Sequence, residues 1–350
     1  MLVWPVRRTS TGKFLTFEDH NQAHKPRALI ISGMLCRHAS FKIRLPSEGG
    51  SCKLVQALDE EHVTSLLEKC TSQFTNSSNE TFRRAGYVCL GHLFIRKPAL
   101  VLKPESKAAL ERGLATGGSE QVRQVVLRML NEFIEAGDEK VEDAKPDEVS
   151  GAITIRNTLM QQYLNQILEC VYDRRDEVAV EALKLVAGIY DRGQVHPQHC
   201  IADLVAVQQR GNHCANIGLH VLRSIVEKHP SYCVAEVWVG GVMKGTRLQK
   251  DGQGPLVDAL SRTFELRAND KGFVQRVIRY SIDLIRAVSR LDETAESLRE
   301  KCFLSNVLAT LPFPQEVGLF HPLPGLCHAH ATHCDSTSEL SRLRRITSSC

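Results

Sequence analysis

Apolar residues recur at helical spacing along most of the chain. In the stretch NTLMQQYLNQILECVYD the apolar positions step by three and four residues, at Leu159, Met160, Tyr163, Leu164, Ile167, Leu168 and Val171. Residues at this spacing lie on one face of an α-helix, and that face has to be covered by another element. The pattern therefore predicts a helix over residues 157–173 that packs against neighbours.

The same period continues in further blocks, and strand signals are almost absent. Apolar positions at helical spacing fall in the ranges 54–74, 81–95, 120–134, 178–189, 201–205, 217–226, 234–248, 256–266 and 273–288. The breaks between blocks are short, such as RKP, ATGGS, DRR and KHP. Short connections favour antiparallel neighbours.

About a dozen helices joined by short corners indicate a repeat architecture. Two helices with their corners occupy roughly 40 residues, which is the period of HEAT and armadillo repeats. We therefore predict an all-α fold, a HEAT-type α-solenoid of antiparallel helix pairs. A compact helical domain remains the alternative.

The helical pattern divides the chain into regions. HEAT-like helices are predicted over residues 27–135 and 152–311. Residues 136–151, AGDEKVEDAKPDEVSG, are acidic, contain a proline and lack an apolar period, which predicts an exposed linker. The N-terminal segment 1–26 and the Pro/His/Ser-rich tail 312–350 are expected to be poorly ordered.

Composition says little about the fold, but it bears on where the protein is located and on the state of its cysteines. Hydrophobic residues make up 43% and charged residues 24% of the chain, which are ordinary globular values. No run of 18 apolar residues occurs and the start lacks the order of a secretory signal, so we expect an intracellular protein without a membrane partner. Most of the twelve cysteines fall on apolar helical positions, including Cys89, Cys170 and Cys302, which favours buried thiols over disulfides.

Two Cys/His stretches are candidate metal sites. VHPQHC places His196, His199 and Cys200 close together, but no second ligand pair lies nearby in the sequence, as a structural zinc site would need. A helix corner explains the stretch better, with Gly193 just after one helix and Pro197 at the first position of the next. CHAHATHC (residues 327–334) is the stronger metal candidate, yet a short His-rich tract is usually compositional. We predict no metal and no cofactor.

The sequence contains no common catalytic motif. It lacks the phosphate-binding G-x-x-x-x-G-K-[ST], the nucleophile elbow G-x-S-x-G and the zinc motif H-E-x-x-H. We therefore predict no catalytic residue. An enzyme that uses the Cys/His tail remains a competing class, and it would lose its activity when residues 312–350 are deleted.

Pairs of arginines are the candidate nucleic-acid contacts. The formal net charge of +4 is too small to indicate nucleic acid by itself, so any contact needs a local patch. The pairs are Arg83 with Arg84, Arg174 with Arg175, and Arg276 with Arg279. Basic residues at the corners of successive repeats can align into a stripe that neutralises phosphates. A solvated surface is the alternative.

Three motifs resemble the HEAT-repeat subunit of the cohesin loader, the Nipped-B family. The family pattern quYLkqvLe is similar to YLNQILE at 163–169, and rQGLVHPvQCvp is similar to RGQVHPQHCI at 192–201. The pattern EKHPSFV is similar to EKHPSYC at 227–233. The order and the spacing of the three agree with the family, and the central motif includes Gly193, Val195, His196, Pro197 and Cys200.

The resemblance extends outwards from these motifs. It includes RALIISGMLCRHASF at 27–41, FRRAGYVCLGHLFIRKPALVLKPESKAAL at 82–110 and QVRQVVLRMLNEFIEAGDEKVEDA at 121–144. Together the similar stretches cover about residues 27–242. The segment after VHPQHC departs from the family pattern, and the tail after Leu311 resembles no part of it.

The resemblance implies a non-catalytic, nuclear and chromatin-associated scaffold. Such a scaffold binds double-stranded DNA and cohesin, through its SMC ATPase heads and its kleisin, and promotes topological loading for sister chromatid cohesion. Family members are several times longer, and their segment that binds a TPR-type partner subunit has no counterpart here, so the chain is expected to correspond to the C-terminal repeat region. The runner-up is a generic HEAT-repeat interaction module, such as a transport or trafficking adaptor.

Overall fold

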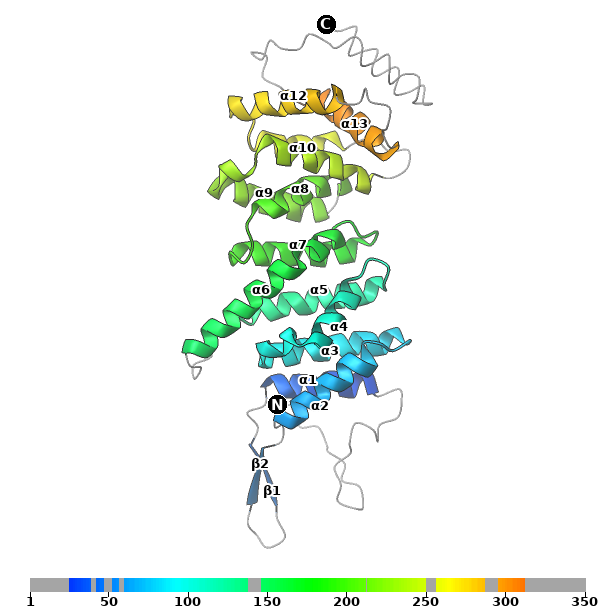
Figure 1. The fold of residues 1–350 in the computed structure, drawn as a ribbon, viewed down its shortest axis with the longest axis vertical. Coiled ribbons are helices and arrows are strands. Elements are labelled where there is room, and N and C mark those ends of the chain that lie inside the picture. Colours follow the sequence, from blue (N-terminus) through cyan, green and yellow to red (C-terminus); the bar gives the residue numbers. More distant parts are fainter. Residues whose placement is uncertain are drawn as a thin grey trace. The chain divides into compact units, whose positions relative to one another are not determined.

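The computed structural model describes residues 25–38, 42–46, 52–56, 60–137, 146–211, 213–249, 256–286 and 295–311. These residues form thirteen α-helices, several short 3₁₀ or π turns and one pair of antiparallel strands (Figure 1). The predicted fold class, all-α with HEAT-type helix pairs, is confirmed. None of the described helices combines the length and the apolar composition that crossing a membrane requires.

The chain divides into two compact units, Met1–Val195 and His196–Cys350. The described helices of the first unit are α1 (Lys25–His38), α2 (Glu60–Lys69), α3 (Glu80–Arg96), α4 (Pro104–Leu114), α5 (Glu120–Glu135), α6 (Pro146–Cys170) and α7 (Asp176–Asp191). Those of the second unit are α8 (Gln198–Ala206), α9 (His213–Lys228), α10 (Ala235–Lys244), α11 (Val257–Glu265), α12 (Lys271–Arg286) and α13 (Ala295–Leu308).

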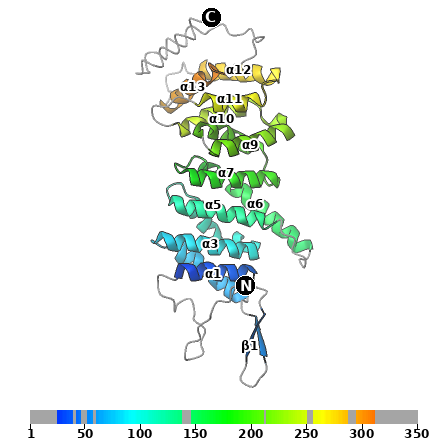
Figure 2. The ribbon, with the colours of Figure 1, turned by 180° about the vertical axis from the view of Figure 1, so that it is seen from behind.

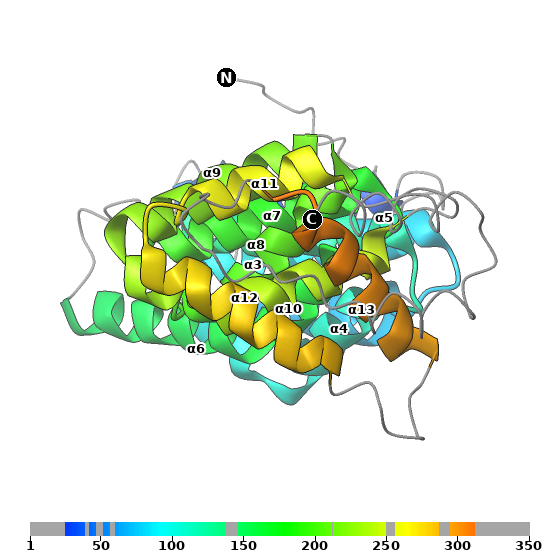
Figure 3. The same cartoon turned by 90° about the horizontal axis from the view of Figure 1, so that it is seen from above.

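In the first unit, α3, α5 and α7 stack side by side and run in the same direction (Figures 1 and 2). Their N-terminal ends are joined by side chains, because Ser119 Oγ donates to Glu80 Oε2 at 2.7 Å and Arg175 pairs with Glu120. Helices α4 and α6 form a second layer, in which Tyr163 Oη donates to the Lys107 carbonyl at 3.4 Å. Seen from above, α4 and α6 lie on one side of α5 and α7, which they contact (Figure 3).

Helix α5 shows how the apolar period becomes a core. Val126, Leu127 and Leu130 are fully buried, while the helix begins with Ser119 Oγ accepting from the Val122 N–H. Helix α3 approaches this face closely, because a Cβ on Gly91 would lie 2.4 Å from Met129 Cγ. The two helices can therefore pack at this distance only because position 91 carries no side chain.

In the second unit, α8 and α10 also run in the same direction, and α10 contacts α12. A Cβ on Gly241 would lie 2.6 Å from the Ala202 carbonyl oxygen, so α8 and α10 meet at this glycine. Trp238 is fully buried at the centre of the unit, and its Nε1–H donates to Thr263 Oγ1 at 2.9 Å. Its ring contacts Phe264 edge-on, with centroids 5.6 Å apart.

The predicted linker at 136–151 needs correction. Residues 146–151 form the first turns of α6, which begins at Pro146, whereas 138–145 lie outside the described residues. A proline at the first helical position followed by acidic residues favours a helix start, because the proline needs no N–H partner there and the acids complement the helix dipole. The sequence PDE therefore carried a start signal that the acidic composition concealed.

The predicted helix at 54–74 begins later than expected. Strand β2 (Cys52–Gln56) includes residues 54–56 and pairs antiparallel with β1 (Lys42–Pro46). The segment SEGGS (residues 47–51) between these strands is a hairpin signal that the apolar period alone does not reveal. The end of the range, Cys70–Phe74, is a π turn, in which the Thr75 N–H donates to the Cys70 carbonyl at 3.0 Å.

Other expectations concern the ends of the chain and the buried thiols. Helices α4 and α13 were not among the ranges predicted from the apolar period, and α1 begins at Lys25, inside the segment expected to be poorly ordered. Residues 1–24 and the tail 312–350 lie outside the described residues. Cys89 and Cys170 are buried free thiols, and Cys302 is half-buried.

Candidate nucleic-acid interface

The structure brings two of the predicted arginine pairs to one edge of the first unit. This N-terminal edge consists of residues 77–84, 115–123 and 173–177, which lie at the starts of α3, α5 and α7. Arg84 Nη1 donates to Gln121 Oε1 at 3.1 Å, and Arg175 Nε lies 2.8 Å from Glu120 Oε2. Arg84 and Arg175 therefore both reach the first turn of α5, one from each neighbouring helix.

Arg83 points back into its own corner. Its Nη1 donates to the carbonyls of Ser77 at 2.9 Å and Ser78 at 3.1 Å, and the residue is half-buried. These carbonyls belong to the turn that precedes α3. Part of the Arg83 guanidinium is thus used to hold the turn, which leaves it less available to a phosphate than its neighbour Arg84.

The neighbours Arg174 and Arg175 differ in their partners. Arg174 is exposed and makes no hydrogen bond or ion pair with any residue that the structure describes. The Arg175 side chain is 52% exposed and pairs with Glu120, whose side chain is 38% exposed. Arg174 is therefore the free cation of this pair within the described part of the chain, whereas Arg175 already has an anionic partner.

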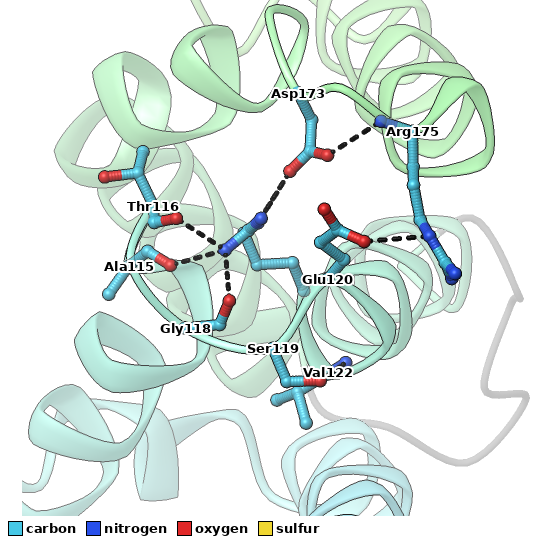
Figure 4. Close-up of polar contacts among 9 residues, drawn as sticks. Ala115, Thr116, Gly118, Ser119, Glu120, Val122, Asp173 and Arg175 are labelled. Carbon is cyan, nitrogen blue, oxygen red and sulfur yellow. Dashed lines mark hydrogen bonds and ion pairs between the residues drawn. The ribbon is translucent and has the colours of Figure 1, made fainter.

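A buried ion pair fixes the corner that carries these two arginines (Figure 4). Arg123 Nε donates to Asp173 Oδ2 at 2.9 Å, and both side chains are only 5% exposed. Arg123 Nη1 also donates to three carbonyls of the loop before α5, those of residues 115, 116 and 118, at 2.8 to 3.0 Å. The other carboxylate oxygen, Asp173 Oδ1, accepts from the Arg175 N–H at 3.0 Å. We call Arg123, Asp173 and the loop carbonyls the Arg123 bracket.

The Arg123 bracket is not among the sites predicted from the sequence. Arg123 stands one position after the buried Val122 and four before the buried Leu127, on the apolar face of α5. A charged residue on the apolar face of a helix is seldom buried unless it has a partner. The position of Arg123 in the apolar period therefore indicated a buried ion pair. The partner itself lies in another repeat and could not be read from the local pattern.

The N-terminal edge carries acidic residues as well as arginines. Glu80 and Glu120 are in the first turns of α3 and α5, and Asp176 with Glu177 begins α7. Acids at helix starts stabilise the helix dipole, so each has a structural reason to be there. The N-terminal edge therefore carries both acidic and basic side chains. A phosphate would be attracted by the exposed arginines and repelled by these acids.

The third predicted pair, Arg276 and Arg279, lies on α12 in the second unit. Both side chains are exposed, and neither makes a hydrogen bond or an ion pair with the described residues. They are three positions apart, so they share one face of the helix, where Gln275 and Asp283 are also exposed. This pair is a helix-face cluster and does not lie at a corner.

The predicted corner begins with a helix C-terminus in the first unit. Gly193 follows α7 with φ of +62°, the left-handed region that glycine adopts without steric cost. Its N–H donates to the Tyr190 carbonyl at 2.9 Å, and the next N–H, of Gln194, donates to the Ile189 carbonyl at 3.0 Å. These two bonds are the Schellman motif, which satisfies carbonyls at a helix end. Val195 is buried directly after it.

The second half of the motif begins the second unit. Pro197 precedes α8 as its N-cap residue, and the His196 side chain accepts from the Gln198 N–H through Nδ1 at 3.3 Å. The His196 ring also packs against Tyr232, with centroids 4.5 Å apart. Cys200 is buried, and burial, with a smaller effect of Asp203, raises the pKa of its thiol to about 12. A thiol held protonated in this way is a poor metal ligand.

Chelators are expected to leave the melting temperature of the chain unchanged. The described residues contain no group of three or more His, Cys, Asp or Glu side chains placed to hold a metal ion. The candidate stretch 327–334 lies outside the described residues. Because structural zinc contributes folding free energy, a thermal melt with and without EDTA checks this expectation. A lower melting temperature that added zinc restores would contradict it.

Comparison with protein-family models matches residues 156–323 to the family described as the sister chromatid cohesion C-terminus, Nipped-B_C. Nipped-B-like protein A of Danio rerio is 30% identical over 195 residues, which covers 52% of this chain and 8% of that protein. Nipped-B-like protein of Homo sapiens is 26% identical over 196 residues, which covers 52% of this chain and 7% of that protein. The matched stretch is thus a small part of these relatives.

A solved structure shares the fold. The C-terminal fragment of the cohesin loader SCC2 of Chaetomium thermophilum matches with a TM-score of 0.60 at 14% identity. The match covers 90% of this chain and 24% of that chain. At this identity the likeness concerns the arrangement of helices alone.

Proposed function

We propose that this chain is a non-catalytic cohesin-loading scaffold, because its residues 156–323 match the family model described as the sister chromatid cohesion C-terminus. In this proposal it acts in the nucleus, binds double-stranded DNA and cohesin, and promotes topological loading of cohesin onto chromatin. Its contacts within cohesin are the SMC ATPase heads and the kleisin. A TPR-type subunit is the partner of longer family members.

One observation carries this proposal, the family match that spans the corner residues. The matched range, residues 156–323, includes Gly193, His196, Pro197 and Cys200. In the structure, Gly193 ends α7 and His196 caps the start of α8, so the motif has a structural role at a helix corner. The match therefore concerns the helical framework, and the proposed DNA contacts are argued separately.

The proposed DNA contacts are the exposed arginines Arg84, Arg174 and Arg175 of the N-terminal edge, and Arg276 with Arg279 of α12. Arg83 belongs to the same set but contributes less, because its guanidinium holds a turn. A scaffold that loads cohesin at many places needs to hold duplex DNA without reading its sequence. Contacts from arginine to phosphate provide such binding, because phosphates are the same at every base pair.

Reversing the charge of Arg174 and Arg175 together is expected to weaken duplex binding about tenfold or more at low salt. The loss should be similar for unrelated DNA sequences, and the dependence of affinity on salt should become flatter because fewer counterions are released. Fluorescence anisotropy with a labelled duplex over a salt series measures both quantities. The melting temperature should change little, since exposed substitutions usually alter stability by about half a kcal/mol or less.

A matched control reverses Arg223 and Arg262 in the second unit. Both are exposed, on α9 and α11, and the total change in charge is the same. We expect the control to retain most of the affinity. If it weakens binding as much as the corner variant, the affinity follows net charge and the corner has no special role. If the chain does not bind duplex DNA at low salt, the generic HEAT-repeat adaptor becomes the better interpretation.

A further inference from the structure

The carboxylate of Glu120 occupies the position next to Arg175 that a DNA phosphate would need. Glu120 Oε2 lies 2.8 Å from Arg175 Nε, and more than half of the arginine side chain remains exposed, at 52%. Figure 4 shows the Arg175 side chain reaching over the first turn of α5, where it meets Glu120. The carboxylate thus competes for this guanidinium with any anion from solution.

We propose that Glu120 controls the affinity of the N-terminal edge for DNA by holding Arg175 in an ion pair that phosphate must replace. This inference rests on the proposed DNA-binding function. In the free chain only Arg174 of the two neighbours offers an unpaired guanidinium. On binding, Arg175 exchanges the carboxylate for a phosphate, so part of the binding free energy is used to break the ion pair with Glu120.

The exposure of the two ion pairs decides which one can exchange. Solvent-exposed ion pairs are weak because water screens them, so a phosphate can displace Glu120 from Arg175. A phosphate also accepts two parallel hydrogen bonds from one guanidinium, whereas Glu120 contacts Arg175 through Nε. The pair of Arg123 with Asp173 is only 5% exposed on either side and has no such competitor.

The Arg123 bracket allows the exchange without moving the corner. Asp173 is held by Arg123 through one carboxylate oxygen and accepts the Arg175 N–H through the other. The backbone at Arg175 is therefore fixed, while its side chain is free to turn from Glu120 towards a phosphate. The Arg123 bracket thus holds the backbone of Arg175. The exposed Arg175 side chain can then exchange Glu120 for a phosphate.

Replacing Glu120 by glutamine tests the inference directly in the full chain. Glu120→Gln is expected to tighten binding of a labelled duplex about threefold to fivefold at low salt, the upper part of the range of a surface ion pair. The slope of log affinity against log salt should change by less than about 0.9, the value of one phosphate contact, because Arg175 contacts a phosphate in the bound state of both chains. Glutamine keeps the size of the side chain, so the melting temperature should remain close to that of the unchanged chain.

A double-mutant cycle with Arg175→Gln separates the ion pair from general electrostatics. In the Arg175→Gln background, Glu120→Gln should change the affinity by less than about twofold, because no guanidinium remains to be released. The matched control is Glu177→Gln, an exposed first-turn acid of α7 with the same change in charge. Its effect should be the same whether position 175 is arginine or glutamine.

The outcomes distinguish this inference from the proposed function. If Glu120→Gln leaves the affinity unchanged while charge reversal of Arg174 and Arg175 abolishes binding, the inference is wrong and the DNA contact stands. An equal gain in the Arg175→Gln background also overturns the inference, because the effect is then general repulsion. If neither set of variants changes binding, the N-terminal edge does not contact DNA and both proposals fail there.

Discussion

Replacing Arg123 by methionine is expected to lower the free energy of unfolding by about 3–5 kcal/mol. The methionine removes the guanidinium that pairs with Asp173, whose side chain is 5% exposed, and leaves the carboxylate charge in a buried site. Three loop carbonyls at positions 115, 116 and 118 lose their donor at the same time. Breaking one side of a buried pair costs more than the pair contributes, because the remaining charge is unsolvated.

Urea unfolding followed by circular dichroism measures this loss, and Asp173→Asn provides the matched comparison. Asparagine keeps an oxygen that can accept the Arg175 N–H, so it tests the charge without removing the local turn. The double variant should be less destabilised than the sum of the two single variants, with a coupling of about 0.5–3 kcal/mol. A loss below about half a kcal/mol for Arg123→Met, the range of surface changes, would show that the bracket does not support the corner.

Truncating Trp238 to alanine is expected to destabilise the second unit by about 3–5 kcal/mol. The indole is fully buried, contacts the edge of Phe264 and donates to Thr263 Oγ1 at 2.9 Å. Alanine would leave a large cavity between α10 and α11, and packed interiors relax only partly around such a cavity. The expected loss combines the lost burial with the cost of the cavity.

Trp238→Phe is the control for this variant. It keeps most of the apolar volume and removes the hydrogen bond to Thr263, whose Oγ1 still donates to the Leu260 carbonyl. The expected loss is about 1–2 kcal/mol, clearly smaller than for alanine. Thermal and urea unfolding compare the two variants. If alanine and phenylalanine are equally tolerated, the indole is not the packing centre of this unit.

The apolar period predicted the helices whose bounds depend on local sequence. Helix α5 spans Glu120–Glu135 against a prediction of 120–134, and α12 spans Lys271–Arg286 against 273–288. In both helices the apolar residues lie on one face, and the N-terminal end of each helix has a residue that caps it. Burial of that face explains why the pattern and the structure agree.

The pattern was wrong where composition or length concealed the local signal. The start of α6 at Pro146 lay inside an acidic stretch, and β2 at Cys52–Gln56 was read as the start of a helix. Five residues are too few to separate period two from period 3.6 in a short apolar run. The π turn at Cys70–Phe74 lies inside the predicted helix 54–74, because the apolar period did not separate it from the α-helix that precedes it.

The arginines of the candidate site can be selected from the sequence, but the residues with which they pair cannot. Arg174 and Arg175 look alike in sequence, yet one is free among the described residues and the other pairs with Glu120 from a different helix. Arg83 and Arg84 also differ in their partners, because Arg83 bonds its own turn whereas Arg84 reaches Gln121 of α5. Such differences depend on how repeats stack, which is non-local information. A single sequence does not contain it in readable form.

Retention of cohesin from a nuclear extract is the most direct measurement of whether this chain is a cohesin-loading scaffold. The full chain serves as bait, and the extract is treated with nuclease so that DNA cannot bridge bait and prey. We expect the SMC and kleisin subunits to be retained together, and to remain bound when Arg174 and Arg175 are reversed, since that change affects DNA contacts. Retention of transport or trafficking proteins without any SMC or kleisin subunit would contradict the proposed function.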